Sequence, residues 1–182
     1  MATATHPRTI RELVTWMRED AEVNRSRGGG TLSVVSVAIF RLNQFGVRGT
    51  GLVPALVRLL SLPLVVFSRL MLSCEVPGSL ACGRRFVLAH GGRGVIIVPD
   101  AVIGDDVVMA PYSGLGVAYP AAGAPTLGDR VYVGASVTVM GPVTVGDGAF
   151  IGTRALVVKD VPAGVLAVGL PAKVVGPAPV QS

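Results

Sequence analysis

The strongest pattern in the chain is an apolar residue that returns at every sixth position of its C-terminal half. Six consecutive hexads follow this rule without an insertion, at Leu127, Val133, Val139, Val145, Ile151 and Val157. A small or β-branched residue lies four positions after each of them, from Val131 to Val161. A period of six fits neither an amphipathic helix (period about 3.6) nor a half-buried strand (period about 2). It predicts a parallel β-helix built from hexapeptide repeats.

The same frame continues upstream at Ile97, Ile103, Met109 and Leu115, whereas an earlier set at Val76, Cys82 and Leu88 is displaced by three residues. Three hexads should form one triangular coil, with the first residue of each hexad inside and tight backbone turns at the corners. We therefore predict a mainly β protein. Residues 74–168 should form a left-handed parallel β-helix, residues 1–73 an α-helical segment and residues 169–182 a C-terminal tail.

One stretch interrupts the rhythm. Residues 116–126 contain Pro120 and Pro125, and position 121 carries no apolar residue large enough to fill the interior. This composition predicts a loop that projects from a corner, and in β-helical enzymes such a loop can reach a neighbouring subunit.

The first 73 residues have helical periodicity instead. Ile10, Leu13, Val14 and Met17 recur at helical spacing, and the three glycines at 28–30 should break that helix. A second apolar helix is expected over residues 32–45, ended by Gly46, and a third over residues 52–72, kinked at Pro63.

The helix expected over residues 52–72 is apolar enough that it must be tested as a membrane-spanning segment. Arg58 and Arg69 interrupt it, and its longest uncharged run, residues 59–68, is too short to span a bilayer. We expect a buried or interfacial helix. The polar N-terminus contains no signal peptide, so we expect a cytoplasmic protein, with peripheral contact to a membrane surface left open.

Composition narrows the possible partners. The chain has 182 residues, 51% of them hydrophobic, and a net charge of +5. Its basic residues are scattered without aromatic interleaving, which argues against nucleic acid and leaves a polyanionic cofactor as a partner. Cys74 and Cys82 provide neither a disulfide framework nor a zinc site, and we expect two buried thiols in a reducing compartment.

Two segments resemble a known family. Residues 159–176, KDVPAGVLAVGLPAKVVG, resemble the segment that closes the β-helix in hexapeptide acyltransferases. Residues 74–92, CEVPGSLACGRRFVLAHGG, resemble the start of the β-helix in the serine acetyltransferase family, and the chain is most similar to the branch of colanic-acid and capsule O-acetyltransferases. The resemblance covers roughly residues 66 to 177. It implies a coenzyme A-dependent O-acetyltransferase, a homotrimer with its site between neighbouring β-helices, and possible higher assembly through the N-terminal helices.

The resemblance assigns the catalytic base to His90 and its acidic partner to Glu75. A histidine suits this role because attack of an alcohol on a thioester requires removal of the hydroxyl proton as the bond forms. A carboxylate bonded to one imidazole nitrogen fixes the tautomer of the ring. The alternatives are a packed corner histidine and a solvated or capping carboxylate. Spacing alone does not bring Glu75 to His90.

The resemblance also suggests contacts for acetyl-CoA. The candidate cofactor-binding residues are Gly116, Ala135, Ser136, Thr153, Arg154, Lys159 and Lys173, of which Lys173 matches a basic residue near the nucleotide phosphates. The oxyanion of the tetrahedral intermediate needs fixed donors, for which the backbone at Gly91-Gly92 or at residues 114–116 is a candidate. We predict no metal site.

The chain departs from the serine acetyltransferase pattern around the acceptor. Ala89 stands where the family has aspartate, and Gly123-Ala124 stand where it has an Arg-His pair. One extra residue follows His90, and Arg93 is a candidate to bind an anionic acceptor. Residues 111–116 also differ from the usual QGVTLG segment.

Three hypotheses follow. The first is an O-acetyltransferase acting on a saccharide or a small hydroxylated metabolite, the second is a serine O-acetyltransferase, and the third is a catalytically silent β-helical scaffold. A γ-type carbonic anhydrase requires three histidines, and His90 is the only one in the predicted β-helix. A sugar nucleotidyltransferase needs a nucleotide-binding domain, for which the N-terminal segment is too short.

Overall fold

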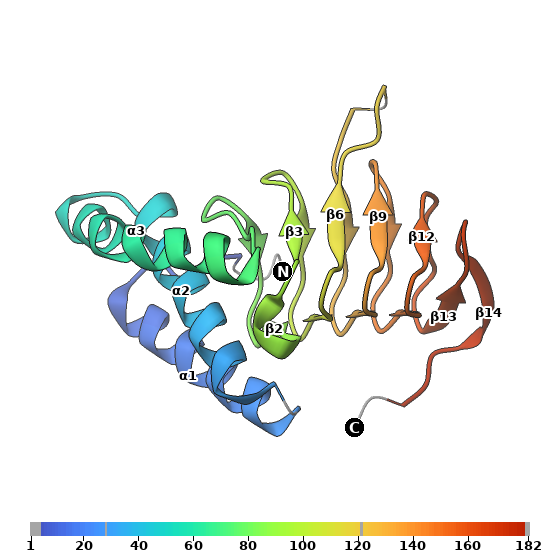
Figure 1. The fold of residues 1–182 in the computed structure, drawn as a ribbon, viewed down its shortest axis with the longest axis horizontal. Helices are drawn as coiled ribbons and strands as arrows, with labels where there is room; N and C mark the ends of the chain where they lie inside the picture. Colours follow the sequence, from blue (N-terminus) through green and yellow to red (C-terminus); the bar gives the residue numbers. More distant parts are fainter. Residues whose placement is uncertain (1–4, 28, 121, 181–182) are drawn as a thin grey trace.

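A computed structural model describes residues 5–27, 29–120 and 122–180. It shows a parallel β-helix with three α-helices at one end (Figure 1). Short strands stack in three sheets, which form the three faces of a triangular coil. This architecture confirms the predicted fold class. Gly28, in the predicted helix break, and Ala121, in the predicted loop, lie outside the described residues.

We number the faces in the order in which the chain meets them. The first face contains β1 (Ala81–Cys82), β4 (Val102–Ile103), β7 (Thr126–Leu127) and β10 (Thr144–Val145). The second contains β2 (Val87–Leu88), β5 (Val108–Met109), β8 (Tyr132–Val133), β11 (Phe150–Ile151), β13 (Val165–Val168) and β14 (Lys173–Pro177). The third contains β3 (Ile96–Ile97), β6 (Gly114–Gly116), β9 (Thr138–Met140) and β12 (Leu156–Val157).

The core consists of the residues that the six-residue period predicts. All six apolar residues from Leu127 to Val157 are at most 1% exposed, because each face contributes one of them to every coil. The small residues that follow are also buried, which lets the backbone turn closely around the interior. Burying such a side chain contributes about 1.5–3 kcal/mol, so the stacked coils add up to the main stabilising force.

Coil lengths explain the displacement seen in the sequence. Residues with positive φ mark the corner between the first and second faces, at Arg85, Asp106, Arg130 and Gly148. They are separated by 21, 24 and 18 residues. Relative to the regular coil of 18, the first coil has three additional residues and the second has six.

The six additional residues form the predicted loop. Residues 117–120 and 122–125 project from the corner between β6 and β7 (Figure 1). Tyr119 in this loop is 99% exposed. The loop follows the third face, away from the corner that precedes that face.

The helical segment comprises α1 (Ile10–Ser26), α2 (Gly30–Arg48) and α3 (Leu52–Leu72). Helix α1 begins with a capping box between Thr9 and Glu12. The predicted end of the second helix at Gly46 is wrong. Gly46 is buried inside α2, where a Cβ atom would lie 2.7 Å from the Arg58 Cβ, so this glycine lets α2 and α3 approach closely. Helix α3 has the predicted bounds and continues through Pro63.

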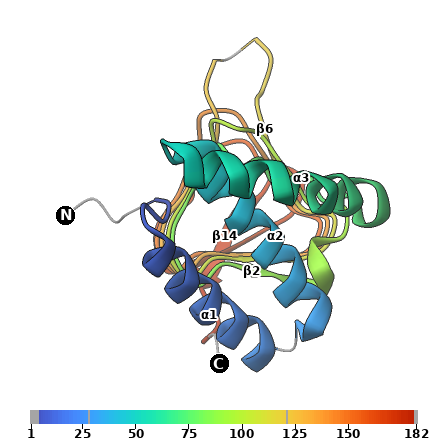
Figure 2. The ribbon, with the colours of Figure 1, turned by 90° about the vertical axis from the view of Figure 1, so that its left-hand side faces the viewer.

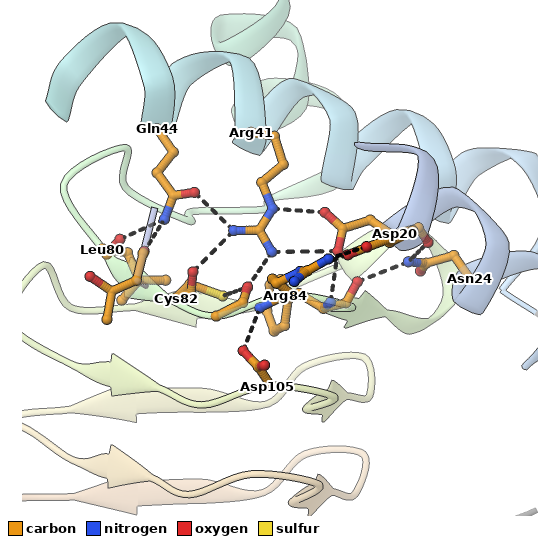
Figure 3. A network of polar contacts seen from close by, with 12 residues as sticks. Asp20, Asn24, Arg41, Gln44, Leu80, Cys82, Arg84 and Asp105 are labelled. Carbon is orange, nitrogen blue, oxygen red and sulfur yellow. Dashed lines mark hydrogen bonds and ion pairs between the residues drawn. The ribbon is translucent and has the colours of Figure 1, made fainter. Parts of the chain in front are cut away.

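The three helices lie across one end of the triangular coil (Figure 2). A buried polar network fastens α1 and α2 to the first coil (Figure 3). The fully buried Arg41 guanidinium forms an ion pair with Asp20 at 2.7 Å and donates to the Cys82 carbonyl at 3.1 Å and to the Gly83 carbonyl. Gln44 donates to the Leu80 carbonyl at 2.9 Å. These side chains satisfy backbone groups of the first coil that no preceding coil is present to pair.

The opposite end of the β-helix is formed differently. Strand β14 turns back and pairs antiparallel with β13, although the other neighbouring strands of this sheet are parallel. The tail expected over residues 169–182 therefore includes an ordered strand on the second face.

Both cysteines are free and buried, as expected. Burial raises the pKa of the Cys74 thiol to about 11 and that of the Cys82 thiol to about 12. The reactive thiolate is therefore scarce at every pH below these values. We expect less than one thiol per chain to react with a disulfide reagent at pH 8 in the folded state, and two after denaturation with guanidinium. Rapid labelling of the folded protein would contradict the buried positions.

Candidate active site

His90 lies in the three-residue insertion of the first coil. It belongs to the short 3₁₀ segment Ala89–Gly92 between the second and third faces. The residue adopts φ +53° and its side chain is exposed. Left-handed backbone is unfavourable for residues other than glycine, but here it recurs at the coil corners, for example at Ser136 and Arg154. The insertion thus carries the imidazole outward from an otherwise regular corner.

Helix α2 holds the backbone of Gly91, the residue that follows His90. The Gly91 N–H donates to Ser33 Oγ at 3.0 Å, and the Ser36 hydroxyl donates to the Gly91 carbonyl at 2.9 Å. The Ser33 hydroxyl donates onward to the Gly29 carbonyl at 2.6 Å. Both serines are buried, so these bonds are shielded from water. Neither serine could be singled out from the sequence, because they lie 58 and 55 residues before Gly91.

Gly91 itself is required by this contact. It has φ +78°, and a Cβ atom there would lie 2.5 Å from Leu32 Cγ. We expect Gly91→Ala to destabilise the fold and to lower kcat, because α2 must move away from the turn that carries His90. Gly148→Ala is the matched control, since Gly148 has φ +65° but open space around its Cα. Its cost is limited to about 1–2 kcal/mol of left-handed strain. Urea unfolding and kcat measured for both variants test the contact, and equal losses would count against it.

Two depressions meet at His90. A groove of about 700 Å³ runs along the second face, and we call it the face groove. Its lining includes Val87, Val108, Tyr132 and Phe150, and the last two rings stack with centroids 4.3 Å apart. A second depression of about 440 Å³, the corner pocket, is lined by Gly29, Leu32, His90, Arg93, Pro111 and Tyr112. An imidazole shared by two depressions can contact two reactants at once.

Glu75 lies on the third face beside the strand that follows His90. Its backbone pairs with Ile96 in a parallel bridge, and its side chain is exposed. Among the described side chains, no hydrogen bond or ion pair joins Glu75 to His90. Glu75 also lines neither the face groove nor the corner pocket. The pairing of these two groups stays a prediction.

Several predicted cofactor residues share one corner with His90. Tyr112, Ser136 and Arg154 have positive φ and stack at the corner between the second and third faces. The Ser136 N–H donates to the Pro111 carbonyl and the Arg154 N–H to the Ala135 carbonyl, both at 2.9 Å. We call this stack the corner column. It also contains Ala135 and Thr153, and Arg93 lies at its base in the corner pocket.

Three other candidates lie elsewhere. Gly116 ends β6 on the third face, and the exposed Lys159 follows β12 on that face. Lys173 begins β14 on the second face and is also exposed. A single chain therefore brings the corner-column candidates to His90 and leaves these three outside the two depressions.

The proposed oxyanion donors are partly wrong. The Gly91 N–H already donates to Ser33, and the Gly114 N–H donates to the Val137 carbonyl at 2.9 Å. Neither group is free to receive a developing oxyanion. For metals, the described residues contain no group of three or more His, Cys, Asp or Glu side chains able to hold an ion.

Comparison with known proteins bears on the fold and the family of this chain. Residues 124–159 match the family model described as bacterial transferase hexapeptide (six repeats). The serine acetyltransferase of Mycobacterium tuberculosis is 32% identical over 170 residues, which cover 90% of this chain and 74% of that protein. A soybean serine acetyltransferase complexed with serine superposes with a TM-score of 0.76 and 25% identity, covering 90% of this chain and 69% of the other. A serine acetyltransferase in complex with CoA shares the fold, with a TM-score of 0.76, 19% identity, and coverage of 91% and 71%.

The repeated coil and the match of residues 124–159 indicate a hexapeptide-repeat protein, and the relatives found are transferases. The chain belongs to the serine acetyltransferase family, and it is an acetyl-CoA-dependent O-acyltransferase. The narrower assignment to the colanic-acid and capsule branch gains no support, because the relatives found are serine acetyltransferases.

Proposed function

We propose that this protein transfers the acetyl group of acetyl-CoA to the hydroxyl of L-serine. The observation that carries the proposal is an exposed His90, shared by two depressions, in a chain 32% identical to a serine acetyltransferase over 90% of its length. Serine replaces a saccharide as our first choice of acceptor, because family membership outweighs the altered residues at 89, 123 and 124.

In the proposed mechanism, His90 acts as general base. An imidazole nitrogen takes the proton of the acceptor hydroxyl as its oxygen attacks the thioester carbonyl. The tetrahedral intermediate then collapses, the carbon–sulfur bond breaks, and the leaving sulfur receives the proton from the imidazolium. The ester and free CoA are the products. The hydrogen bonds that Ser33 and Ser36 form with Gly91 support this role, because a general base must be held in place to accept a proton efficiently.

The corner column is the proposed path of the donor. Ser136 and Arg154 rise from His90 along one corner, and Arg154 offers a positive charge to the phosphates of CoA. The acceptor would occupy the corner pocket, where Arg93 can pair with a carboxylate. The solved serine acetyltransferases with bound serine and with bound CoA support both choices of ligand.

The experiment is a thiol-release assay with purified protein, acetyl-CoA and L-serine, with O-acetylserine identified by mass spectrometry. Turnover should depend on both substrates and should be lost in His90→Asn. Arg93→Gln should mainly raise the KM for serine, whereas Arg154→Gln should mainly raise the KM for acetyl-CoA. Absence of turnover on serine, with turnover on another hydroxyl, would refute serine as the acceptor but keep the acyltransferase.

A saccharide or another small hydroxylated metabolite is the second candidate. One observation favours it: Gly123-Ala124, on the projecting loop, replace the pair to which the family resemblance assigns the amino acid. A parallel panel of L-threonine, glycerol, glucose and galactose separates the two acceptors. Turnover on a sugar with none on serine would make this the preferred function.

We also propose a trimer in which neighbouring chains complete each site. The loop that carries Gly123-Ala124 and the corner that carries His90 lie on opposite edges of the third face. Only a second chain could therefore bring such a loop to His90. Light scattering should give three chains or a multiple of three, and an active monomer would contradict this arrangement.

A further inference from the structure

Helix α3 has an inverted distribution of side chains. Its four buried residues are Pro54, Ser61, Ser68 and Leu72, so three of the four are small or polar. Its large apolar side chains point outward instead, and Leu52, Leu60 and Leu70 are 71–75% exposed. A helix on the surface of a globular protein normally buries its apolar side. The outward side of α3 therefore faces something other than water.

The exposed apolar surface covers more than half of the helix. At 100° per residue it extends from Leu62 through Leu59 and Leu60 to Leu64, an arc of roughly 200°. A single neighbouring helix covers a stripe of about 100°. A surface that covers half of the helix circumference matches that of a helix lying in the boundary between lipid headgroups and acyl chains.

Charge on α3 favours an anionic surface. Its charged residues are Arg58 and Arg69, and it has no Asp or Glu. No ion pair among the described residues involves either arginine. Both line a cleft of about 250 Å³ between α2, α3 and the first coil, together with Asn43, Ser36 and Ser68. Two arginines beside an apolar face provide a site for a phosphate-bearing headgroup. A second copy of α3 would bring two more arginines and no carboxylate.

Both α2 and α3 are long and apolar enough to cross a membrane by length and composition. Half of the apolar window of α2 is buried against the protein, compared with 17% for α3. Helix α3 is nevertheless held along one side. It packs on α2 at Gly46, and the Leu72 carbonyl accepts from the Gly94 N–H of the first coil. These contacts favour a helix that lies on the bilayer over one that spans it.

We propose that α3 docks this acyltransferase on a membrane surface rich in anionic phospholipid, with its leucines in the interface and the Arg58–Arg69 cleft over a headgroup. The proposal does not depend on the acceptor. It places the outer end of the helical segment against the bilayer and leaves the β-helix projecting from it (Figures 1 and 2).

The test is flotation of the full chain with vesicles of phosphatidylcholine alone or with roughly 30% phosphatidylglycerol, which gives the surface a negative potential that attracts arginine. We expect binding to the anionic vesicles that weakens with salt. The triple variant Leu59→Gln, Leu60→Gln, Leu70→Gln should bind at least about tenfold more weakly. Arg58→Gln with Arg69→Gln should lower the preference for anionic vesicles by about thirtyfold.

The matched control is Leu170→Gln, Val174→Gln, Val175→Gln, which replaces three comparably exposed apolar residues near β14. It should bind like the parent protein, and circular dichroism should show that every variant is folded. Failure of the parent to bind either vesicle at low salt would overturn the proposal. So would equal losses in the α3 variant and its control. A third outcome is also possible: the parent does not bind vesicles, and the α3 variant has a lower oligomeric mass than the parent. In that case a second copy of the chain covers this face, and the membrane proposal is wrong.

Discussion

Replacing His90 with asparagine is expected to lower kcat about a hundred- to ten-thousandfold, the usual contribution of a general base. Asparagine retains a polar group of similar size in the same turn but cannot accept the hydroxyl proton at neutral pH. The KM for acetyl-CoA should change little, because the corner column is untouched. The release of CoA thiol at saturating substrates is the measurement.

His6→Asn is the matched control for this variant. His6 lies before α1 and lines neither of the depressions at His90. Its replacement should leave kcat within about a factor of two, which corresponds to about 0.4 kcal/mol. If both variants retained full turnover, His90 would not be the base. If the parent neither bound nor turned over acetyl-CoA, the scaffold hypothesis would stand.

The largest loss of stability is expected at the buried ion pair beneath the helices. Arg41→Met leaves the Asp20 carboxylate without its charged partner in a site where the two side chains are 0% and 2% exposed. Breaking such a pair from one side costs about 3–5 kcal/mol. It also leaves the Cys82 and Gly83 carbonyls of the first coil unpaired. Urea unfolding followed by circular dichroism should report the loss.

A second ion pair provides the control. Arg84 binds Glu19 with side chains that are 38% and 26% exposed, also between the helical segment and the first coil. Arg84→Ala should cost about 1 kcal/mol or less, because water screens and replaces this interaction. The double variant Asp20→Asn, Arg41→Met should recover part of the loss, since no carboxylate is then left unpaired. Equal costs for Arg41→Met and Arg84→Ala would mean that the network in Figure 3 does not fasten the helices.

The β-helix could be predicted because its information is local and repeated. Each hexad places one residue inside, so Leu127 to Val157 could be assigned without knowledge of distant contacts. The displaced frame at Val76, Cys82 and Leu88 is explained by the three additional residues of the first coil near His90. The helix bounds were less predictable. Gly46 suggested a helix end, whereas close packing against Arg58 is what requires glycine there.

The site depends more on contacts between distant segments. His90 could be singled out by its chemistry and by resemblance. No periodicity in the sequence indicates that Ser33 and Ser36 form hydrogen bonds with the backbone of Gly91. The predicted oxyanion donor Gly91 failed for the same reason. For residues 52–72 we expected either a buried or an interfacial helix. The structure argues against the buried alternative, because most of that helix is not covered by this chain.

The two ends of the coil stack also bear on how copies of the chain meet. A stack of parallel coils could in principle grow without limit, because every rung offers unpaired backbone groups to another. Here Arg41 and Gln44 occupy such groups at one end, and the reversed direction of β14 presents an edge that a parallel rung does not match at the other. Both features disfavour head-to-tail polymerisation into fibres. The trimer proposed above would instead use the sides of the triangle, where a closed ring of chains can form.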